Sequence, residues 1–233
     1  MPSFSTDEMP TVASQPMRSL WAAALVGHRE PLKALAERKT LAIYAYFRAE
    51  GSTPEEAAPR TGNFLARLTS AEMPNPAEED IDRFQDFLLH RLQAYATEGF
   101  PPAPAGAEIV SFDPAQAERR FQREAARPAA EIFHRRWALG ILELTIETLR
   151  DSYTSEGKAE LFALLPPFLS FSGGEERYEE AGKKVAMSAS GLRVAVYRFR
   201  QRYRETLRQV VGDTVRDAES ADGELTKLLV QSS

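Results

Sequence analysis

The sequence predicts an all-α protein made of two helical modules, and three observations lead to this fold class. No stretch of the 233 residues alternates apolar and polar residues as a half-buried strand would. Apolar residues instead recur every three or four positions in both halves, which is the spacing of a helix face. Between the halves, residues 99–106 contain three prolines and two glycines, a composition that ends helices and favours a linker. A chain of this length can bury two small cores.

The composition excludes several classes of protein. The 43% hydrophobic and 27% charged residues are typical of a soluble globular protein. The absence of cysteine and the presence of only three histidines argue against a disulfide scaffold, a thiolate metal site and a histidine-built zinc site. The longest apolar runs, residues 20–26 and 161–169, are too short to cross a membrane, and residues 1–17 lack the apolar core of an export signal. We therefore expect a cytoplasmic protein with no metal or cofactor.

The first predicted module covers residues 19–98. It follows an arm at residues 1–18, whose Ser, Thr, Pro and Met content predicts disorder. Residues 41–47 are apolar enough for a buried helix, and a later helix is expected over residues 81–95. Between them, Thr53 can cap a helix that has Pro54 at its first position. Pro59 lies beyond the first turn of that helix and is expected to kink or shorten it.

The second predicted module covers residues 128–211, after a Pro/Gly-rich linker at residues 99–127 and before a C-terminal tail at residues 212–233. Its helices are expected over residues 128–152, 157–165, 178–185 and 189–211. A tight turn around Ala186 joins the last two helices, and an alanine there is tolerable only with a negative φ. Ser188 can then accept a hydrogen bond from the first turn of the final helix.

The final helix carries a basic surface on a protein whose net charge is −5. Six arginines stand against one acid, Glu205, between Leu192 and Arg208. A short helix, a tight turn and a basic helix are typical of a helix–turn–helix module, which places its second helix in the DNA major groove. On this hypothesis, base edges and phosphates are contacted by Ser188, Ala189, Ser190, Arg193, Tyr197, Arg200 and Arg204. The alternative is a solvated face of an ordinary helical bundle.

Other patterns in the sequence do not indicate a site. Glu131 and His134 have the spacing used by di-iron helices, but the second copy that such a site needs is missing. Gly173 and Gly174 lack the strand and the lysine that accompany a phosphate-binding loop. No serine can be matched with a histidine and an acid from the sequence. We therefore expect no catalytic residue and no enzymatic activity.

Segments of the second module resemble a family of bacterial transcription proteins. These segments are FHRRWAL at 133–139, EGKAELF at 156–162, LPPFL at 165–169, YEEAGKKVAMS at 178–188, LRVAVYRFRQRYR at 192–204 and GELTKLL at 223–229. They resemble the extracytoplasmic-function sigma factors, in the branch common in planctomycetes. The resemblance implies promoter DNA and core RNA polymerase as partners, and it allows an anti-sigma protein as a third. It also makes the last two helices the promoter-binding module.

The first module resembles the same family less closely. The matching segments are YAYFR at 44–48, PEEA at 54–57, FLARL at 64–68 and FLL at 87–89. In the family, this module binds the polymerase clamp and melts the promoter. The resemblance therefore implies polymerase contacts at a short set of residues in one helix. These are Glu55, Glu56, Arg60 and Asn63.

Two departures from the family fall in this first module. APRTG at 58–62 stands where the clamp-binding helix normally carries acidic residues, so that Pro59 both breaks the helix and replaces an acid. The family also captures unpaired bases with a basic, aromatic helix, whereas this chain has an acidic segment followed by prolines. The rings that this segment offers are Tyr95 and Phe100.

Three functions fit these observations. The first is a sigma-factor-like transcription initiation protein. The second is a degenerate sigma paralogue that regulates transcription without melting the promoter. The third is a helical adaptor whose arginine-rich helix binds an acidic protein. A salt-dependent DNA shift assay separates the third function from the other two, and in vitro transcription with core polymerase separates the first from the second.

Overall fold

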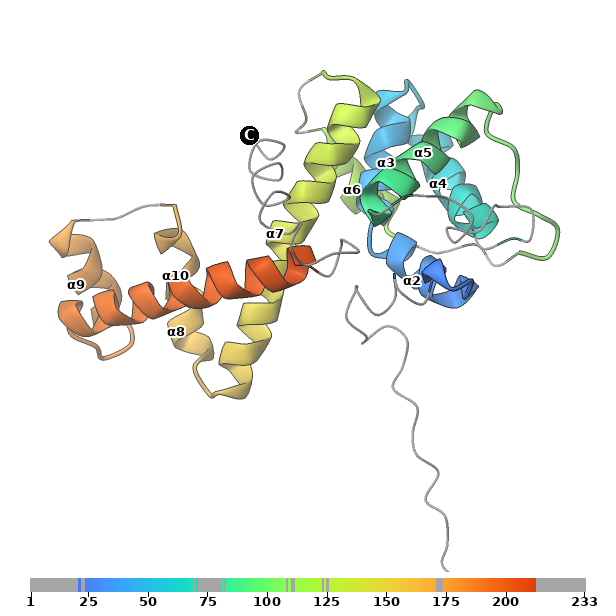
Figure 1. Ribbon diagram of the computed structural model, residues 1–233. Coiled ribbons are helices and arrows are strands. Elements are labelled where there is room, and N and C mark those ends of the chain that lie inside the picture. Colours follow the sequence, from blue (N-terminus) through green and yellow to red (C-terminus); the bar gives the residue numbers. More distant parts are fainter. Residues whose placement is uncertain are drawn as a thin grey trace, which may run out of the picture. The chain divides into compact units, whose positions relative to one another are not determined.

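The computed structural model describes residues 21, 24–68, 70, 81, 83–107, 109, 112–122, 124, 126–170 and 174–212. Every regular element in these ranges is a helix, and none of the described residues belongs to a strand, so the predicted all-α class is confirmed (Figure 1). The predicted arm at residues 1–18 lies outside the described residues, as does the tail beyond residue 212. Contacts divide the chain into two compact units, with boundaries between Ala138 and Leu139 and between Val211 and Gly212.

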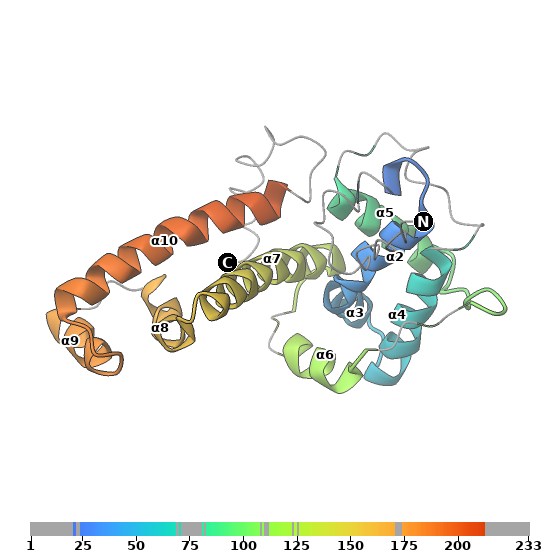
Figure 2. The same ribbon diagram turned by 90° about the horizontal axis from the view of Figure 1, so that it is seen from below.

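Among the described residues, several helices lie wholly within the first unit. They are α2 (Arg29–Glu37), α3 (Thr40–Ala49), α4 (Pro54–Leu68), α5 (Phe84–Thr97) and α6 (Pro114–Phe121). Helix α4 packs against α2 and α3, and Figure 2 shows these helices side by side. The core contains aromatic rings from three helices, with ring centroids of Phe47 and Phe64 6.2 Å apart and those of Phe64 and Tyr95 5.5 Å apart. As predicted, residues 42–47 form a helix segment that is buried throughout.

Helix α4 begins as predicted but is not broken by its internal proline. The Thr53 N–H donates to the Glu56 carboxylate at 2.8 Å, and the Glu56 N–H donates to the Thr53 hydroxyl at 3.3 Å, which is a capping box. The helix then runs for 15 residues through Pro59, so the predicted break is wrong. Pro59 removes the N–H that would bond to the Glu55 carbonyl, and because Pro59 and Glu55 are both exposed residues, water can take the place of that donor.

The predicted linker at residues 99–127 contains helix α6, which packs on α3 and α4. Asp113 caps the helix by accepting the Gln116 N–H at 3.0 Å. The Glu118 carboxylate accepts the Tyr44 hydroxyl at 2.7 Å and the Arg48 guanidinium at 2.8 and 3.0 Å. These bonds lower the pKa of Glu118, the Arg48 bond most strongly, and they fasten α6 to the first unit.

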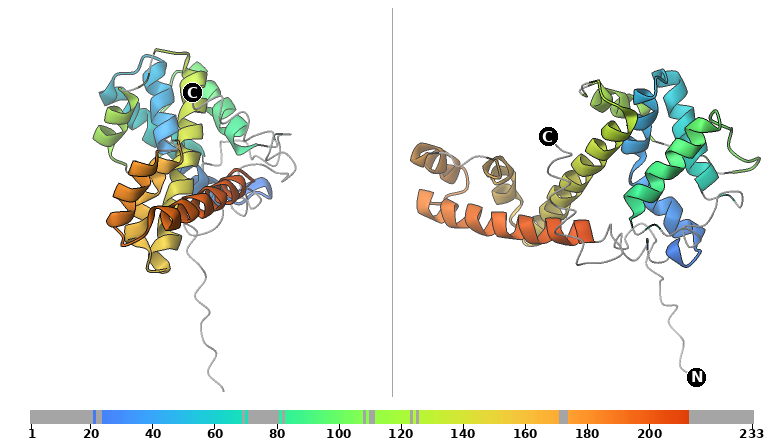
Figure 3. Two further views of the ribbon diagram at one scale, coloured as in Figure 1. Left: turned by 90° about the vertical axis from the view of Figure 1, so that its left-hand side faces the viewer. Right: turned by 45° about the horizontal axis from the view of Figure 1, so that its top comes forward.

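The second unit consists of residues 139–211. Its elements are the later part of α7 (Ala129–Ser155), α8 (Ala159–Leu164), the short 3₁₀ helix η3 (Pro166–Phe168), α9 (Glu175–Lys183) and α10 (Ala189–Gly212). Figure 3 shows α8 and α9 beside the N-terminal half of α10. The core of this unit joins all of these elements. It comprises Leu149, Tyr153, Phe162, Leu165, Phe168, Tyr178, Leu192, Val196 and Phe199.

Helix α7 contributes to both units. It begins within one residue of the predicted start at residue 128, but its first ten residues belong to the first unit. Trp137 is buried there, with its ring centroid 5.6 Å from Phe84 and the Lys39 ammonium 4.4 Å from its ring centre. The sequence assigned this whole helix to the second module. The periodicity of apolar residues predicts a helix, but it cannot show that the two ends of that helix pack in different hydrophobic cores.

Candidate nucleic-acid interface

The turn between α9 and α10 has a tightly defined backbone. The N–H groups of Val185 and Met187 both donate to the Gly182 carbonyl, at 3.1 and 2.9 Å. A Cβ atom on Gly182 would lie 2.5 Å from the Met187 carbonyl oxygen, so only glycine fits there. Ala186 has a φ of 51°. The prediction that alanine is tolerable there only with a negative φ is therefore wrong, because the turn holds Ala186 in the left-handed conformation that glycine adopts more easily.

Ser188 starts helix α10 as the sequence predicted. Its hydroxyl oxygen accepts the Gly191 N–H at 3.1 Å and lies 3.1 Å from the Ser190 hydroxyl. Ser188 and Ser190 are exposed, whereas Ala189 is half-buried against the core of the second unit. The first turn of α10 is thus held at its N-terminus and presents two hydroxyl groups to solvent.

One face of α10 points to solvent along several turns. It comprises Ser190, Val194, Tyr197, Gln201 and Arg204, which recur at three- and four-residue spacing. Val194 is 50% exposed and Tyr197 is 64% exposed. The Gln201 side-chain amide donates to the Tyr197 hydroxyl at 3.2 Å, which ties two members of this face together. We call this set of five residues the outer face of α10.

Arg193 lies at the edge of the outer face and connects α10 to α9. Its guanidinium pairs with the Glu175 carboxylate and lies 5.5 Å from the ring centre of Tyr178. Both partners belong to α9, so the side chain is held near the start of both helices. A guanidinium oriented by a carboxylate keeps further donors that can bind an acceptor such as a guanine edge.

Two of the six arginines in α10 hold the second unit together. Arg200 donates to the Phe168 carbonyl from Nε at 3.0 Å and from Nη2 at 2.7 Å. Arg202 donates to the Glu156 carboxylate at 2.8 Å and to the Ser152 hydroxyl at 2.7 Å. The Arg202 bond is the main reason that the pKa of Glu156 falls to about 2. The basic surface is accordingly smaller than the sequence suggested, and Arg200 faces η3 as a structural residue.

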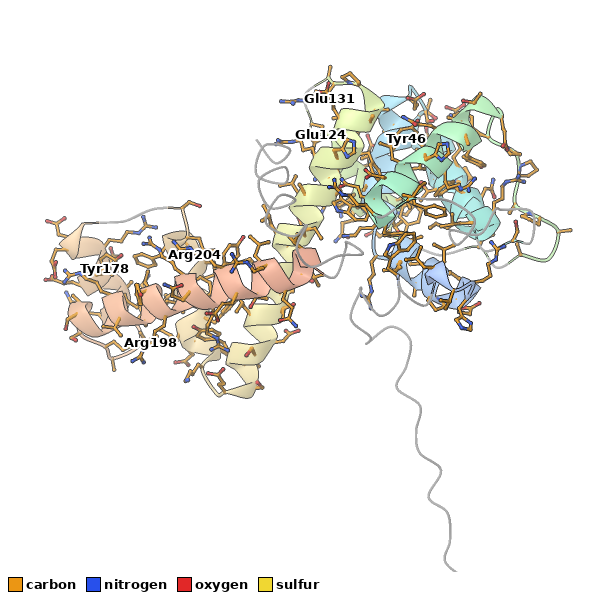
Figure 4. All side chains as sticks on the ribbon, in the orientation of Figure 1. Tyr46, Glu124, Glu131, Tyr178, Arg198 and Arg204 are labelled. Carbon is orange, nitrogen blue, oxygen red and sulfur yellow. The ribbon has the colours of Figure 1, made fainter. Side chains whose placement is uncertain are left out.

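The remaining positive charge lies on α10 and on the turn before it. Arg198 and Arg204 are exposed and project from α10 (Figure 4), and within the described residues neither forms an ion pair with a carboxylate. Lys183 and Lys184 are exposed at the end of α9 and in the turn. The exposed acids of this part of the chain lie mainly on α9. They are Glu175, which pairs with Arg193, and Glu176, Glu179 and Glu180, while Glu205 is the exposed acid on α10. Positive side chains therefore outnumber acids on the turn and α10, and acids outnumber them on α9.

The residues expected to contact polymerase lie on α4 of the first unit. Glu55 and Glu56 are exposed, and Asn63 is half-buried. Arg60 is engaged within its own unit: it bonds to the Ser52 hydroxyl, pairs with Glu56 at 3.6 Å and lies 4.0 Å from the ring centre of Phe100. The structure thus brings Glu55 and Asn63 to one face of α4, two turns apart, and turns Arg60 toward the residue 100 loop.

The two aromatic rings considered for the capture of unpaired bases are packed against other side chains of the first unit. Tyr95 is buried, its hydroxyl donates to the Pro101 carbonyl at 3.0 Å, and burial raises its pKa to about 12. Phe100 is half-buried, and its ring centroid lies 5.8 Å from that of Phe47 and 5.7 Å from that of Tyr95. Both rings therefore belong to the aromatic core of the first unit, and the Arg60 guanidinium covers Phe100.

The described residues contain no cluster of three or more histidines, cysteines or acids that could hold a metal ion. His134 is bonded through Nδ1 to the Gln85 amide at 2.9 Å. None of the described helices combines the length and apolar character needed to cross a bilayer.

Comparisons with protein-family models, with curated proteins and with solved structures found no match.

Sequence reasoning missed two residues that the structure makes prominent. Val194 shares a helix face with Ser190 and Tyr197, and counting four positions from one and three from the other would have found it. Glu118 left no comparable signal, because its partners Tyr44 and Arg48 lie 74 and 70 positions away in the sequence. A contact of that range emerges only from the folded chain.

Proposed function

We propose that this protein is a sigma-factor-like transcription protein that binds promoter DNA through α9, the turn and α10, acts in the cytoplasm and associates with RNA polymerase. The observation that carries the proposal is the outer face of α10, which begins at a capped N-terminus and bears exposed polar, apolar and cationic side chains. An α-helix fits the major groove of duplex DNA, and the early residues of a second helix meet the base edges there.

Each part of the segment has a role in this proposal. Ser190, Arg193 and Tyr197 face the bases, while Arg204 contacts the phosphate backbone. Arg198 and Lys183 add further phosphate contacts. Arg200 leaves the set of DNA-binding residues that the sequence suggested, because its donors already bind the Phe168 carbonyl. Arg198 and Arg204 are therefore available to a ligand, whereas Arg200 and Arg202 are bonded within the second unit.

A second function is favoured by the state of the first unit. Holding unpaired bases requires exposed rings and positive charge. Tyr95 and Phe100 are packed in the core instead. This packing supports a sigma paralogue that binds promoter DNA and polymerase but does not melt the duplex. Glu55 and Glu56 are exposed on α4, so polymerase binding by this helix remains part of the second function.

Fluorescence anisotropy with short random-sequence duplexes tests DNA binding. We expect affinity to fall with rising salt and the salt slope to decrease by about one for each of Arg198→Ala and Arg204→Ala that removes a phosphate contact. Arg150→Ala is the matched control, because Arg150 is also an exposed arginine of the second unit but lies on α7. Equal binding by wild type and both α10 variants would leave the adaptor that binds an acidic protein as the better explanation.

Permanganate footprinting with core polymerase separates initiation from regulation. If the rings of the first unit stay packed, the full-length protein should retain promoter binding and give little thymine reactivity in the downstream promoter element. Strong reactivity there would contradict the second function and favour a working initiation factor.

A further inference from the structure

We propose that Val194 and Tyr197 form an apolar contact for the C5-methyl group of a thymine, and that this contact sets part of the DNA sequence preference of the protein. The inference rests on the proposed function, since it requires α10 to lie in a major groove. It adds a residue, Val194, and a base identity that the general basic surface does not specify.

The first argument is the exposure of the two side chains. A valine and a tyrosine at this spacing lie on the same side of a helix, one turn apart. Both point to solvent, at 50% and 64% exposure, while Leu192, Val196 and Phe199 of the same helix are buried in the core. Among the described residues of the second unit, Val194 and Tyr197 are the large apolar side chains left exposed. They lie in the first three turns of α10.

Positively charged side chains surround Val194 and Tyr197, and this charge favours a nucleic acid over a protein as the partner. Arg193 lies beside the pair on one side and Arg198 on the other, and Arg204 follows further along the outer face. Two apolar side chains are also far fewer than a stable protein interface needs, since such an interface buries about 800 Å² on each partner. A small apolar contact flanked by cations matches the chemistry of a groove that has base methyl groups at its floor and phosphates at its rims.

The third argument is the chemistry of the bases. Thymine is the DNA base with a methyl group in the major groove, and that methyl is contacted by apolar side chains. The isopropyl group of Val194 has no polar atom that would compete for a base edge. The hydroxyl of Tyr197 accepts the Gln201 amide, so its own proton remains available to donate to a neighbouring base or phosphate oxygen.

The test uses the full-length protein and a library of short random duplexes. Wild-type protein should enrich a motif, and each thymine of that motif is then replaced by deoxyuridine, which lacks only the methyl group. We expect one or two positions at which deoxyuridine weakens wild-type binding by about fourfold, the value for removing one buried methyl group. At those positions, Val194→Ala should bind thymine and deoxyuridine duplexes equally.

Two controls keep this test specific. Val26→Ala removes the same atoms from a valine that is 74% exposed in the first unit, and this variant should retain the wild-type preference for thymine. Because Val194 is exposed, Val194→Ala should also unfold at the wild-type temperature, which excludes misfolding as the cause.

Each outcome of the experiment has a distinct meaning. If no motif is enriched and binding does not depend on salt, the proposed function itself fails. If a motif is enriched but deoxyuridine has no effect, or if Val194→Ala keeps the wild-type methyl dependence, the proposed function stands and the thymine contact is overturned. Loss of the methyl dependence in Val194→Ala alone supports the contact.

Discussion

Replacing Arg200 with alanine should destabilise the second unit by about 2 kcal/mol, although the sequence places this residue among the DNA contacts. Arg200 is half-buried and donates two hydrogen bonds, at 3.0 and 2.7 Å, to the Phe168 carbonyl. A hydrogen bond from a charged donor contributes about 1.5–3 kcal/mol. The two bonds converge on one oxygen, so we count them as a single interaction near the middle of that range. Arg204→Ala, on the exposed face, should change stability by less than about 0.5 kcal/mol.

Urea unfolding followed by two signals can assign this effect to the second unit. Both tryptophans, Trp21 and Trp137, lie in the first unit, so their fluorescence reports that unit, whereas far-UV circular dichroism reports the helices of both. For a small unit, a loss of 2 kcal/mol lowers the urea midpoint by about 1–2 M. We expect the circular dichroism transition of Arg200→Ala to begin at lower urea than that of wild type. The tryptophan transition should move less.

Comparing Arg200→Ala with Arg204→Ala shows whether each arginine stabilises the second unit or binds DNA. Arg204→Ala should weaken DNA binding at wild-type stability, and Arg200→Ala should retain DNA binding at urea-free, low-temperature conditions where it is folded. If Arg200→Ala has wild-type stability and loses DNA affinity, then Arg200 contacts phosphate and the bonds to Phe168 do not stabilise the unit.

Three further predictions concern single contacts. Glu118→Gln should destabilise the first unit by about 1.5–3 kcal/mol, measured by urea unfolding, because Arg48 loses its ionised partner. A wild-type urea midpoint in that variant would refute the role of Glu118 in holding α6 to α3. Ala186→Gly should raise the free energy of unfolding by about 0.5–1 kcal/mol by relieving the positive φ, and no gain in thermal midpoint would contradict it. Glu156→Gln should unfold more easily than wild type at neutral pH. Since the pKa of Glu156 falls from 4.5 to about 2 in the folded protein, stability is present above pH 4.5 and lost toward pH 2, so thermal midpoints of the two proteins should converge over that window.

The helices themselves could largely be predicted from the sequence, because their signals are local. Thr53 and Glu56 form a capping box around Pro54, and Ser188 caps α10 by accepting the Gly191 N–H, so each cap involves residues within four positions of one another. Apolar residues of α10 recur at three- and four-residue spacing, and those that include Leu192, Val196 and Phe199 form its buried face. Period and capping chemistry are properties of a single segment, so a single segment reveals them.

What could not be predicted depends on contacts between distant segments. Helix α6 is short and charged, and its attachment through Glu118 to α3 is invisible in the local pattern. The roles of the arginines in α10 also differ by their surroundings: Arg200 meets a carbonyl of η3, whereas Arg204 meets solvent. Arg200 and Arg204 are the same residue type in the same helix, so the sequence could not show that Arg200 is bonded within the unit and that Arg204 is exposed.

The continuity of α7 has a practical consequence for dividing the protein into fragments. A truncation beginning at residue 128 would look natural from the prolines before it, yet it would carry Ile132, Phe133 and Trp137 away from the core in which they are buried. Those uncovered side chains would make the fragment prone to aggregate. A cut at residue 139 removes them but leaves α7 without its first ten residues and without a cap. Expression of the second unit alone should therefore start at residue 139 with a designed N-cap residue, such as serine or aspartate, placed before it.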